Sequence, residues 1–241
     1  MQFDWYQATI KGHQIGHVLD RLKLLGDELV KDDSSAKAFR YTQGFAVRKN
    51  GSTVAKIAIG QKSKDTVVLD HVHAWATSSD AIEFSDLLRN EFPDDHYVTR
   101  ADACEDFVFD DAYKKLQKQA KKVAVKHCLS FKEYKDDLNR DAGRTQYIGS
   151  KKSDYLGRIY EKGFEVFQKN RDYFDICRPD GRVILNARPD LGEFFIGDWV
   201  RSELAAKPQG DFARKQASKA TPEQLWTFTS WSHDLAKKMF D

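Results

Sequence analysis

Hydrophobic and polar residues alternate along much of this chain, with the period of β-strands that have one buried face. Three of the alternating segments follow one another across short polar turns, a pattern typical of an antiparallel meander. The alternating segments are residues 3–10, 39–48, 53–60, 65–75, 96–108, 143–148, 154–162 and 198–206. Gly149-Ser150-Lys151-Lys152 predicts a hairpin between 143–148 and 154–162, and Pro179-Asp180-Gly181 predicts the turn of a second hairpin.

Other segments repeat with the period of a helix. Apolar residues three and four positions apart predict helices over 14–31, from Ser79 or Asp80 to about Asn90, and over 110–127. Thr221-Pro222-Glu223-Gln224 combines a cap, a proline at the first helical position and a glutamine three residues after the cap, so a terminal helix is expected.

Together these elements predict an α+β fold, with a mostly antiparallel central sheet flanked by helices. We expect one domain over residues 1–206, with a C-terminal helical tail, residues 207–241, packed on this domain or extending it.

The composition excludes several classes of protein. Hydrophobic residues make up 41% of the 241 residues, which is too many for a disordered chain. Cys104, Cys128 and Cys177 are far apart, so neither a disulfide framework nor a thiolate zinc site is expected. The N-terminal segment is charged, and no stretch reaches the roughly 20 apolar residues of a membrane span. We therefore expect a soluble protein of the cytoplasm with no membrane partner.

Lysines gather on one side of the helix predicted at 110–127. At about 100° per residue they fall within an arc of roughly 140°, with Leu116, Ala120 and Val123 opposite. The net charge is only +2, so a surface for nucleic acid has to be local. Such a stripe suits a phosphate backbone, although a solvated surface helix has the same pattern. The lysines of this stripe are Lys114, Lys115, Lys118, Lys121, Lys122 and Lys126.

The strand predicted at 96–108 carries acidic residues on a face that a sheet would bury. Asp102 and Asp106 share that face if the segment is extended. A buried carboxylate is costly unless it is paired or binds a cation, and oxygen ligands suit Mg²⁺ or Mn²⁺. The alternative to a metal is an ion pair of Asp102 with Arg100 or with another arginine.

The strand predicted at 198–206 has the same geometry. Trp199, Arg201 and Glu203 alternate onto one face, so a guanidinium and a carboxylate project side by side. The alternative to a functional site is that these charged residues only form a cross-strand ion pair under the packed Trp199.

The second arm of the first hairpin places Arg158, Tyr160 and Lys162 on one face. A tyrosine flanked by cations is suited to attack on a phosphodiester, because nearby positive charge would lower the phenol pKa from about 10 and stabilise the phosphorane. A tyrosyl-DNA link conserves the phosphodiester, so such a reaction can reverse. Nine tyrosines occur in the chain, and Tyr147 and Tyr155 stay open as alternatives.

Three blocks of this sequence together resemble the replication initiation factors of the Rep_trans type, which serve rolling-circle plasmids, filamentous phages and some integrative elements. The hairpin resembles the family pattern Y-x-G-S-[RK]-x-S followed by R-[IFV]-Y-[DEN]-K. The upstream block resembles an acidic T-R-x-D-x-x-x-D strand and the downstream block a W-x-R-x-E strand. The matching residues are Tyr147 to Ser153, Arg158 to Gly163, then Thr99, Arg100, Asp102 and Asp106, and finally Trp199, Arg201 and Glu203.

The resemblance implies a rolling-circle replication initiator that nicks origin DNA by metal-assisted transesterification, with residues 1–206 as the catalytic domain. By position, Tyr160 attacks the scissile phosphate, remains covalently attached to the cut strand and leaves a free 3′-OH that primes synthesis. Asp102 and Glu203 would hold Mg²⁺ or Mn²⁺. Asp106 is left out of this ligand set, because it follows Ala-Cys-Glu, where members of the family more often have apolar residues.

The remaining charged residues receive roles as DNA contacts. Arg158, Lys162 and Arg201 would be phosphate-side or structural cations, and the lysine stripe with Lys151 and Lys152 would hold DNA. The implied partners are origin DNA that is single-stranded or extruded as a hairpin at the nick, a host helicase, and a second copy of the chain in a homodimer.

Other interpretations compete with this one. His71-Val72-His73 has the metal signature of another class of DNA-nicking enzymes, although the helical tyrosine followed four residues later by lysine is missing. A repressor could use the same scaffold for sequence-specific DNA binding without nicking. A tyrosine recombinase would need arginine and histidine sets near its C-terminus, where His233 stands alone. A structural or partner-binding module would leave the charged strand residues unexplained.

Overall fold

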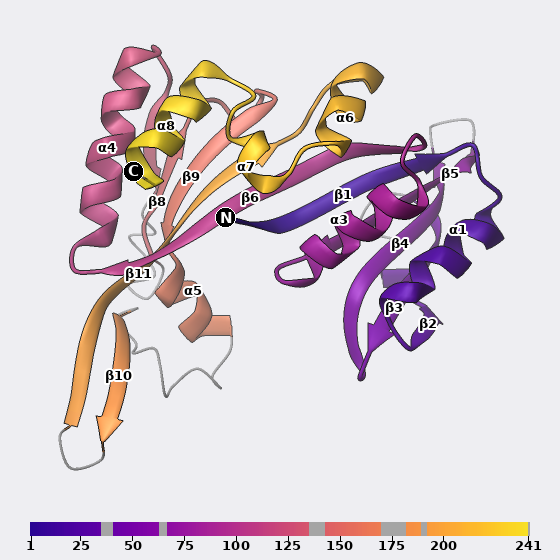
Figure 1. Ribbon diagram of the computed structural model, residues 1–241, viewed down its shortest axis with the longest axis horizontal. Coiled ribbons are helices and arrows are strands. Elements are labelled where there is room, and N and C mark those ends of the chain that lie inside the picture. The colour runs from indigo at the N-terminus through magenta and orange to yellow at the C-terminus, as the bar shows by residue number, and fades with distance from the viewer. Residues whose placement is uncertain (35–40, 63–66, 135–142, 170–181, 189–191, 241) are drawn as a thin grey trace. The chain divides into compact units, whose positions relative to one another are not determined.

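In the computed structural model of this protein, residues 1–34, 41–62, 67–134, 143–169, 182–188 and 192–240 are described (Figure 1). They form two compact units, each assembled from separated parts of the chain. The N-terminal unit consists of Gln2–Ala103 and Ala206–Pro222. The C-terminal unit consists of Met1, Cys104–Ala205 and Glu223–Asp241.

The sheet of the N-terminal unit has the strand order β2-β3-β4-β5-β1-β6, where β6 continues into the other unit. The registers of β1 with β5 and of β2, β3, β4 and β5 with their neighbours are antiparallel. These strands confirm the predicted meander. Their bounds are Gln2–Lys11 (β1), Glu28–Lys31 (β2), Tyr41–Lys49 (β3), Ser52–Lys62 (β4), Val67–Thr77 (β5) and His96–Phe109 (β6).

Helices cover this sheet through an apolar layer. Tyr6 of β1 meets Phe3 and Phe84 edge to face, at centroid distances of 5.0 and 6.1 Å, and all three rings are buried. Burial of such aromatic surface is the main stabilising contribution of the layer. The helices of this unit are α1 (Ile15–Leu22), the 3₁₀ turn η1 (Lys23–Leu25), α3 (Asp80–Glu91) and α6 (Gly210–Ser218).

The helix predicted over 14–31 is wrong in its second half, because α1 ends at Leu22 and β2 begins at Glu28. At Gly26 the chain turns against β3, where an added Cβ would lie 2.2 Å from the carbonyl oxygen of Arg48. The amide of Asp27 donates to that carbonyl at 2.8 Å and starts the pairing of β2 with β3. The apolar spacing of 14–31 cannot show this turn, which depends on the close approach that glycine permits.

The sheet of the C-terminal unit has the order β6-β11-β9-β8-β7, and β10 pairs with β11. The defined registers are again antiparallel, and β8 pairs with β9 from Thr145↔Tyr160 to Ile148↔Gly157. The predicted hairpin across 149–152 is therefore present, whereas the turn predicted at Pro179-Asp180-Gly181 lies outside the described residues. The strands are β7 (Phe131–Tyr134), β8 (Thr145–Ile148), β9 (Tyr155–Glu161), β10 (Arg182–Arg188) and β11 (Gly192–Ala206).

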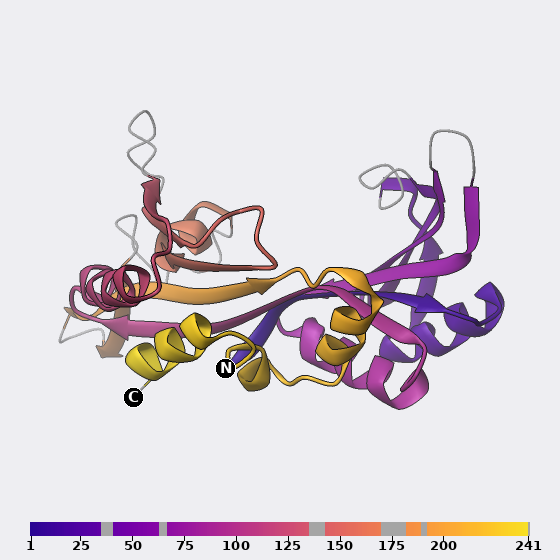
Figure 2. The same cartoon turned by 90° about the horizontal axis from the view of Figure 1, so that it is seen from above.

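Helices α4 and α8 lie on one side of this sheet and α5 lies on the other (Figure 1); Figure 2 is the view from the side of α4 and α8. Gln117 of α4 donates to Gln146 of β8 at 3.0 Å, and Ser202 of β11 donates to the sulfur of Met239 of α8 at 3.0 Å. Ile159 of β9 is fully buried on this apolar side. The helices of the unit are α4 (Ala112–Lys126), α5 (Lys162–Lys169), α7 (Pro222–Leu225) and α8 (Ser230–Phe240).

The terminal helix predicted from Thr221 is interrupted. The chain leaves helical geometry after Leu225, where the Trp226 side chain is fully buried, and α8 starts only at Ser230. The hydroxyl of Thr229 accepts from the Ser232 amide at 3.1 Å, which gives α8 a cap of its own.

The α+β class with an antiparallel sheet flanked by helices is confirmed. The tail predicted at 207–241 divides between the two units after Pro222, and the grouping of residues 1–206 into one domain stays a prediction. Within the described residues, the helices are too short or too polar to cross a lipid bilayer.

Candidate active site

One face of the sheet in the C-terminal unit is polar. Alternation along β11 points Ser202 toward α8, so Arg201 and Glu203 point to the opposite face. Along β9, Ile159 points toward the helices, so Arg158 and Tyr160 lie on the same face as Glu203. This face, which we call the polar face, contains the site.

Tyr160 lies half-buried near the end of β9, with two cations within reach of its ring. The guanidinium carbon of Arg158 is 5.4 Å from the ring centroid, and the ammonium of Lys162 is 5.8 Å from it. Both distances are within the range of a cation–π contact. The arrangement therefore concentrates positive charge around a phenol.

Lys162 reaches this position by a different route from the one predicted. The strand ends at Glu161, and Lys162 is the first residue of α5. Its ammonium donates to Glu165 one helical turn later, at 2.8 Å. Because α5 begins at Lys162, this helix and not the alternation of a strand sets the position of the Lys162 side chain.

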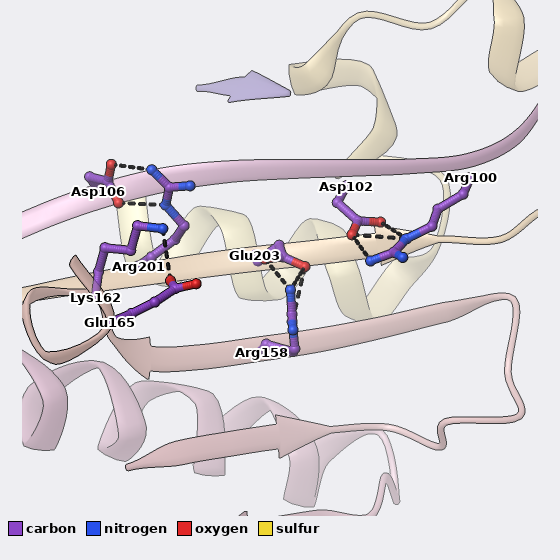
Figure 3. Close-up of polar contacts among 8 residues, drawn as sticks. All are labelled: Arg100, Asp102, Asp106, Arg158, Lys162, Glu165, Arg201 and Glu203. Carbon is purple, nitrogen blue, oxygen red and sulfur yellow. Dashed lines mark hydrogen bonds and ion pairs between the residues drawn. The ribbon is translucent and has the colours of Figure 1, made fainter. Parts of the chain in front are cut away.

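A buried ion pair joins β9 to β11. Nε of Arg158 donates to Oε1 of Glu203 at 3.0 Å, and Nη2 donates to Oε2 at 2.5 Å (Figure 3). The Glu203 side chain has no exposed surface, whereas that of Arg158 is 28% exposed. A carboxylate in this position is strongly destabilising without its partner. Glu203 therefore holds Arg158 beside Tyr160.

A second ion pair follows on the same face, between β11 and β6. Nε and Nη2 of Arg201 donate to the two carboxylate oxygens of Asp106 at 2.7 and 2.6 Å (Figure 3). This bidentate geometry is the strong form of the arginine–carboxylate bond. Arg201 is only 7% exposed, so its guanidinium is occupied within the protein.

Asp102 belongs to the N-terminal unit and is paired there. Nε of Arg100 lies 3.0 Å from both carboxylate oxygens of Asp102, which is buried. The guanidinium of Arg100 also lies 4.7 Å from the centroid of a Trp5 ring. The arginine pair that the sequence offered as an alternative is therefore formed.

The acidic residues do not make a metal site as they stand. Asp102, Asp106 and Glu203 each bond an arginine, and no group of three or more histidine, cysteine or acidic side chains within the described residues is placed to hold a metal ion. Mg²⁺ and Mn²⁺ require several oxygen ligands around one point. In this arrangement the carboxylates neutralise guanidinium ions instead.

The histidine pair lies in the N-terminal unit, on β5. Nδ1 of His73 is 2.9 Å from the Thr9 hydroxyl, and the Tyr41 ring packs at a centroid distance of 4.8 Å. Burial, then the neighbouring His71 and more distant cations, lower the pKa of His73 to about 4. The imidazole is therefore neutral at pH 7, with a hydrogen bond to a threonine.

The lysine stripe of α4 is exposed along its length. Leu116, Ala120 and Val123 are buried on the opposite side of the helix, as the spacing predicted. Lys114 is partly neutralised by Asp111 at 3.0 Å, and Lys126 bonds Asp234. Since α4 covers the apolar side of the sheet, the stripe points away from the polar face that carries Tyr160.

The tip of the β8–β9 hairpin presents Lys151 and Lys152 to solvent. The Lys151 ammonium is 4.6 Å from the Tyr147 ring centroid and 4.8 Å from that of Tyr134. Tyr134 was not among the residues that the sequence pointed to. Its strand, β7, has only four residues, and the placement of Lys132 and Tyr134 on one face was the available signal.

The ion pair of Arg144 with Glu161, which the sequence did not point to either, fixes the start of the hairpin. The guanidinium of Arg144 donates to Glu161 at 2.6 Å and lies 4.3 Å from the centroid of the Tyr113 ring. The Glu161 carboxylate raises the pKa of Arg144 further. This pair ties the β8–β9 hairpin to α4 and so supports the strand that carries Tyr160.

A solved structure has a fold similar to that of this chain. The chain is similar to the solved structure of a rolling circle replication initiator protein from Geobacillus stearothermophilus, with a TM-score of 0.53 and 18% identity. The similarity covers 93% of this chain and 79% of that one. At this identity the likeness shows the fold. No protein-family model and no curated protein matches the chain.

The buried histidine makes the stability of the protein dependent on pH. Because the pKa of His73 is about 4 in the folded state and near 6.5 when unfolded, the unfolded state binds more protons between these values. We expect the free energy of unfolding to fall by up to about 3 kcal/mol as the pH is lowered from 6.5 to 4. Urea unfolding at a series of pH values measures this slope.

His73→Gln should flatten the slope, and the exposed His233 provides the matched control. His233→Gln should retain the wild-type slope, because this side chain is exposed on α8. Equal slopes for the wild type and His73→Gln would contradict the assignment.

Proposed function

We propose that this chain is a rolling-circle replication initiator that nicks origin DNA with Tyr160 as the nucleophile. The observation that carries the proposal is that Arg158 and Lys162 both lie within about 6 Å of the Tyr160 ring centroid, at 5.4 and 5.8 Å, on the polar face. The similarity of the fold to a rolling circle replication initiator supports it.

The reaction that suits this geometry is a transesterification. The phenol oxygen of Tyr160 forms a bond to the scissile phosphorus, and the bond from phosphorus to the 3′-oxygen breaks. The phenol proton passes to solvent, and the leaving 3′-oxygen takes a proton to become a free hydroxyl. The number of phosphate ester bonds is unchanged, so the 3′-OH can attack the tyrosyl ester and reverse the step.

The two cations stabilise the charge that develops in this step. A phosphorane carries more negative charge than the phosphodiester, and fixed positive groups beside it lower its energy. Arg158 is held in place by Glu203, and Lys162 by Glu165. The carboxylates therefore restrict the motion of both cations, so less reorganisation is needed when the phosphate arrives.

A divalent ion, Mg²⁺ or Mn²⁺, with Asp102 and Glu203 as ligands, stays a prediction from the resemblance. Arg100 and Arg158 occupy these carboxylates in the structure, so either ligand would have to exchange an arginine for the metal. Origin DNA as substrate, a host helicase and a homodimer are further parts of the proposal.

A repressor that binds DNA without cutting it is the second candidate function. The exposed lysine stripe favours it, because the stripe points away from Tyr160 and provides a duplex-binding surface that needs no catalysis. Formation of a covalent protein–DNA adduct separates the two functions.

The first test is Tyr160→Phe with supercoiled origin DNA and Mg²⁺, followed by denaturing electrophoresis. Nicking and the covalent adduct should fall by roughly 10⁴-fold or more, because the attacking oxygen is removed. DNA binding should stay close to wild type. Mass measurement of the oligonucleotide–peptide adduct from the wild type should identify Tyr160.

Tyr155→Phe is the matched control, since Tyr155 lies on the helix-covered side and its ring meets Phe228. It should form the adduct at the wild-type rate. An adduct formed by Tyr160→Phe would remove Tyr160 as the nucleophile and leave Tyr147 and Tyr155 as the next residues to test.

The second test concerns the carboxylates. Asp102→Asn and Glu203→Gln should lower nicking by about 10- to 100-fold and raise the Mg²⁺ or Mn²⁺ concentration that is required, if these residues bind the ion. His71→Ala should change nicking little. Nicking is measured across a titration of each metal, with a chelator as the zero point.

The shape of that titration distinguishes two roles of Glu203. Recovery at high metal concentration indicates a ligand, whereas a loss that is equal at all concentrations assigns Glu203 to positioning Arg158. Full activity in both amide variants with loss in His71→Ala would favour the histidine pair.

The third test replaces Lys118, Lys121 and Lys122 of the lysine stripe by glutamine. Affinity for duplex DNA should fall, and the slope of log K against log salt should decrease by roughly 0.9 for each lost phosphate contact. Fluorescence anisotropy at several salt concentrations measures both.

A control variant removes the same charge from the N-terminal unit, at the exposed Lys23, Lys31 and Lys207. This variant should retain the wild-type slope. If the stripe variant also retains it, α4 is a solvated surface and does not bind DNA.

A further inference from the structure

Two tyrosines and a lysine form a compact cluster on the C-terminal unit. The rings of Tyr134 and Tyr147 meet edge to face at 5.2 Å and 90°. The ammonium of Lys151 lies over both rings, 4.8 Å from the centroid of Tyr134 and 4.6 Å from that of Tyr147. An aromatic pair that shares one cation is a chemical unit that the proposed reaction does not use.

The cluster lies on the polar face. Glu133 and Gln146 bond α4 side chains, so the next residues along each strand, Tyr134 and Tyr147, point to the other side of the sheet. Tyr147 pairs with Arg158 in the register of β8 and β9. The cluster and Tyr160 are therefore neighbours on one surface.

The cluster is accessible. Tyr134 keeps 50% of its surface exposed, and Lys151 is exposed at the hairpin tip. Lys132, which pairs with Tyr147 on the outer strand, and Lys152 of the turn add two exposed cations. A tyrosine that only stabilised the hairpin would gain more from burial than this exposure allows.

We propose that Tyr134, Tyr147 and Lys151 form a subsite for single-stranded DNA beside the scissile phosphate, a proposal that rests on the proposed function. Bases stack on the tyrosine rings, and the Lys151 ammonium contacts a backbone phosphate. Aromatic rings combined with cations are the general means of binding single strands without reading their sequence. The subsite holds the strand that Tyr160 cuts.

The spacing of the residues agrees with this role. Diagonal neighbours on adjacent strands, such as Tyr147 and Tyr160, lie about 7–8 Å apart. A stacked strand rises about 3.4 Å per nucleotide, so this distance corresponds to about two nucleotides. A base on Tyr147 would thus lie within one or two positions of the nick, where pairing has to be broken for attack.

The experiment measures binding of a short oligothymidylate that contains one 2-aminopurine, with all proteins carrying Tyr160→Phe so that no covalent link forms. Tyr134→Leu should weaken binding by about 5- to 150-fold, the range for one stacked base, and reduce the quenching of 2-aminopurine fluorescence. Tyr134→Phe should retain both, because the ring is kept. Phe212→Leu, at an 80% exposed aromatic of the N-terminal unit, is the matched control and should bind normally.

Two further measurements complete the design. One is the binding of duplex DNA of the same length, and the other is the thermal unfolding of each variant. Duplex binding and the unfolding temperature should be unchanged in Tyr134→Leu. Unchanged single-strand affinity and quenching would overturn the subsite, and so would an equal loss of duplex binding. Lys151→Gln should weaken single-strand binding and lower its salt dependence, while an unchanged salt dependence would remove Lys151 from the subsite.

Adduct formation by the protein with native Tyr160 separates this proposal from the proposed function. An adduct together with normal oligothymidylate binding by Tyr134→Leu would remove the subsite and keep the nicking function. Weak binding by Tyr134→Leu without any adduct in the wild type would keep the subsite and remove the nicking function.

Discussion

The ion pair between Arg158 and Glu203 is the interaction on which the polar face depends. Glu203 has no exposed surface, so its charge is tolerated only because Arg158 donates to both of its oxygens. The same guanidinium lies beside the Tyr160 ring. Removal of Glu203 would therefore release the cation, and removal of Arg158 would leave a buried carboxylate without its partner. This one ion pair therefore stabilises the pairing of β9 with β11 and also holds a positive charge beside the phenol of Tyr160.

The division of the sheet into two faces explains how one small unit can hold both a core and a charged surface. The side chains of Ile159 and Ser202 point to the helix-covered face. Those of the next residues in sequence, Tyr160 and Glu203, point to the polar face. The lysine stripe follows from the same arrangement, because α4 buries one side and exposes the other. The cations beside Tyr160 and the lysine stripe are consequently on different sides of the sheet, so in the proposed function catalysis and duplex binding would use separate surfaces.

The sequence could predict what depends on local period and could not predict what depends on strand order. Alternation gave β1, β3–β6, the β8–β9 hairpin and the end of β11, and helical spacing gave α3 and α4. It failed after Leu22, where the close approach of Gly26 to Arg48 turns the chain into β2, and at Lys162, where a helix begins inside an apparent strand. The partners of Glu203 and Asp106 lie on strands 45 and 95 residues away in sequence, and only the order β6-β11-β9 brings them together.

The arginine pairs also change how the acidic residues should be interpreted. A carboxylate on an inner face of a sheet requires a cation, and the sequence alone does not say whether the cation is a metal ion or a guanidinium. Here a guanidinium is present in each case, and its five donors in a planar fork allow it to bond a carboxylate and a phosphate at the same time. Arg158 therefore need not leave Glu203 in order to contact DNA. A phosphate that enters beside Tyr160 would extend an existing ion pair, which requires less rearrangement than assembling a charged site from separate residues.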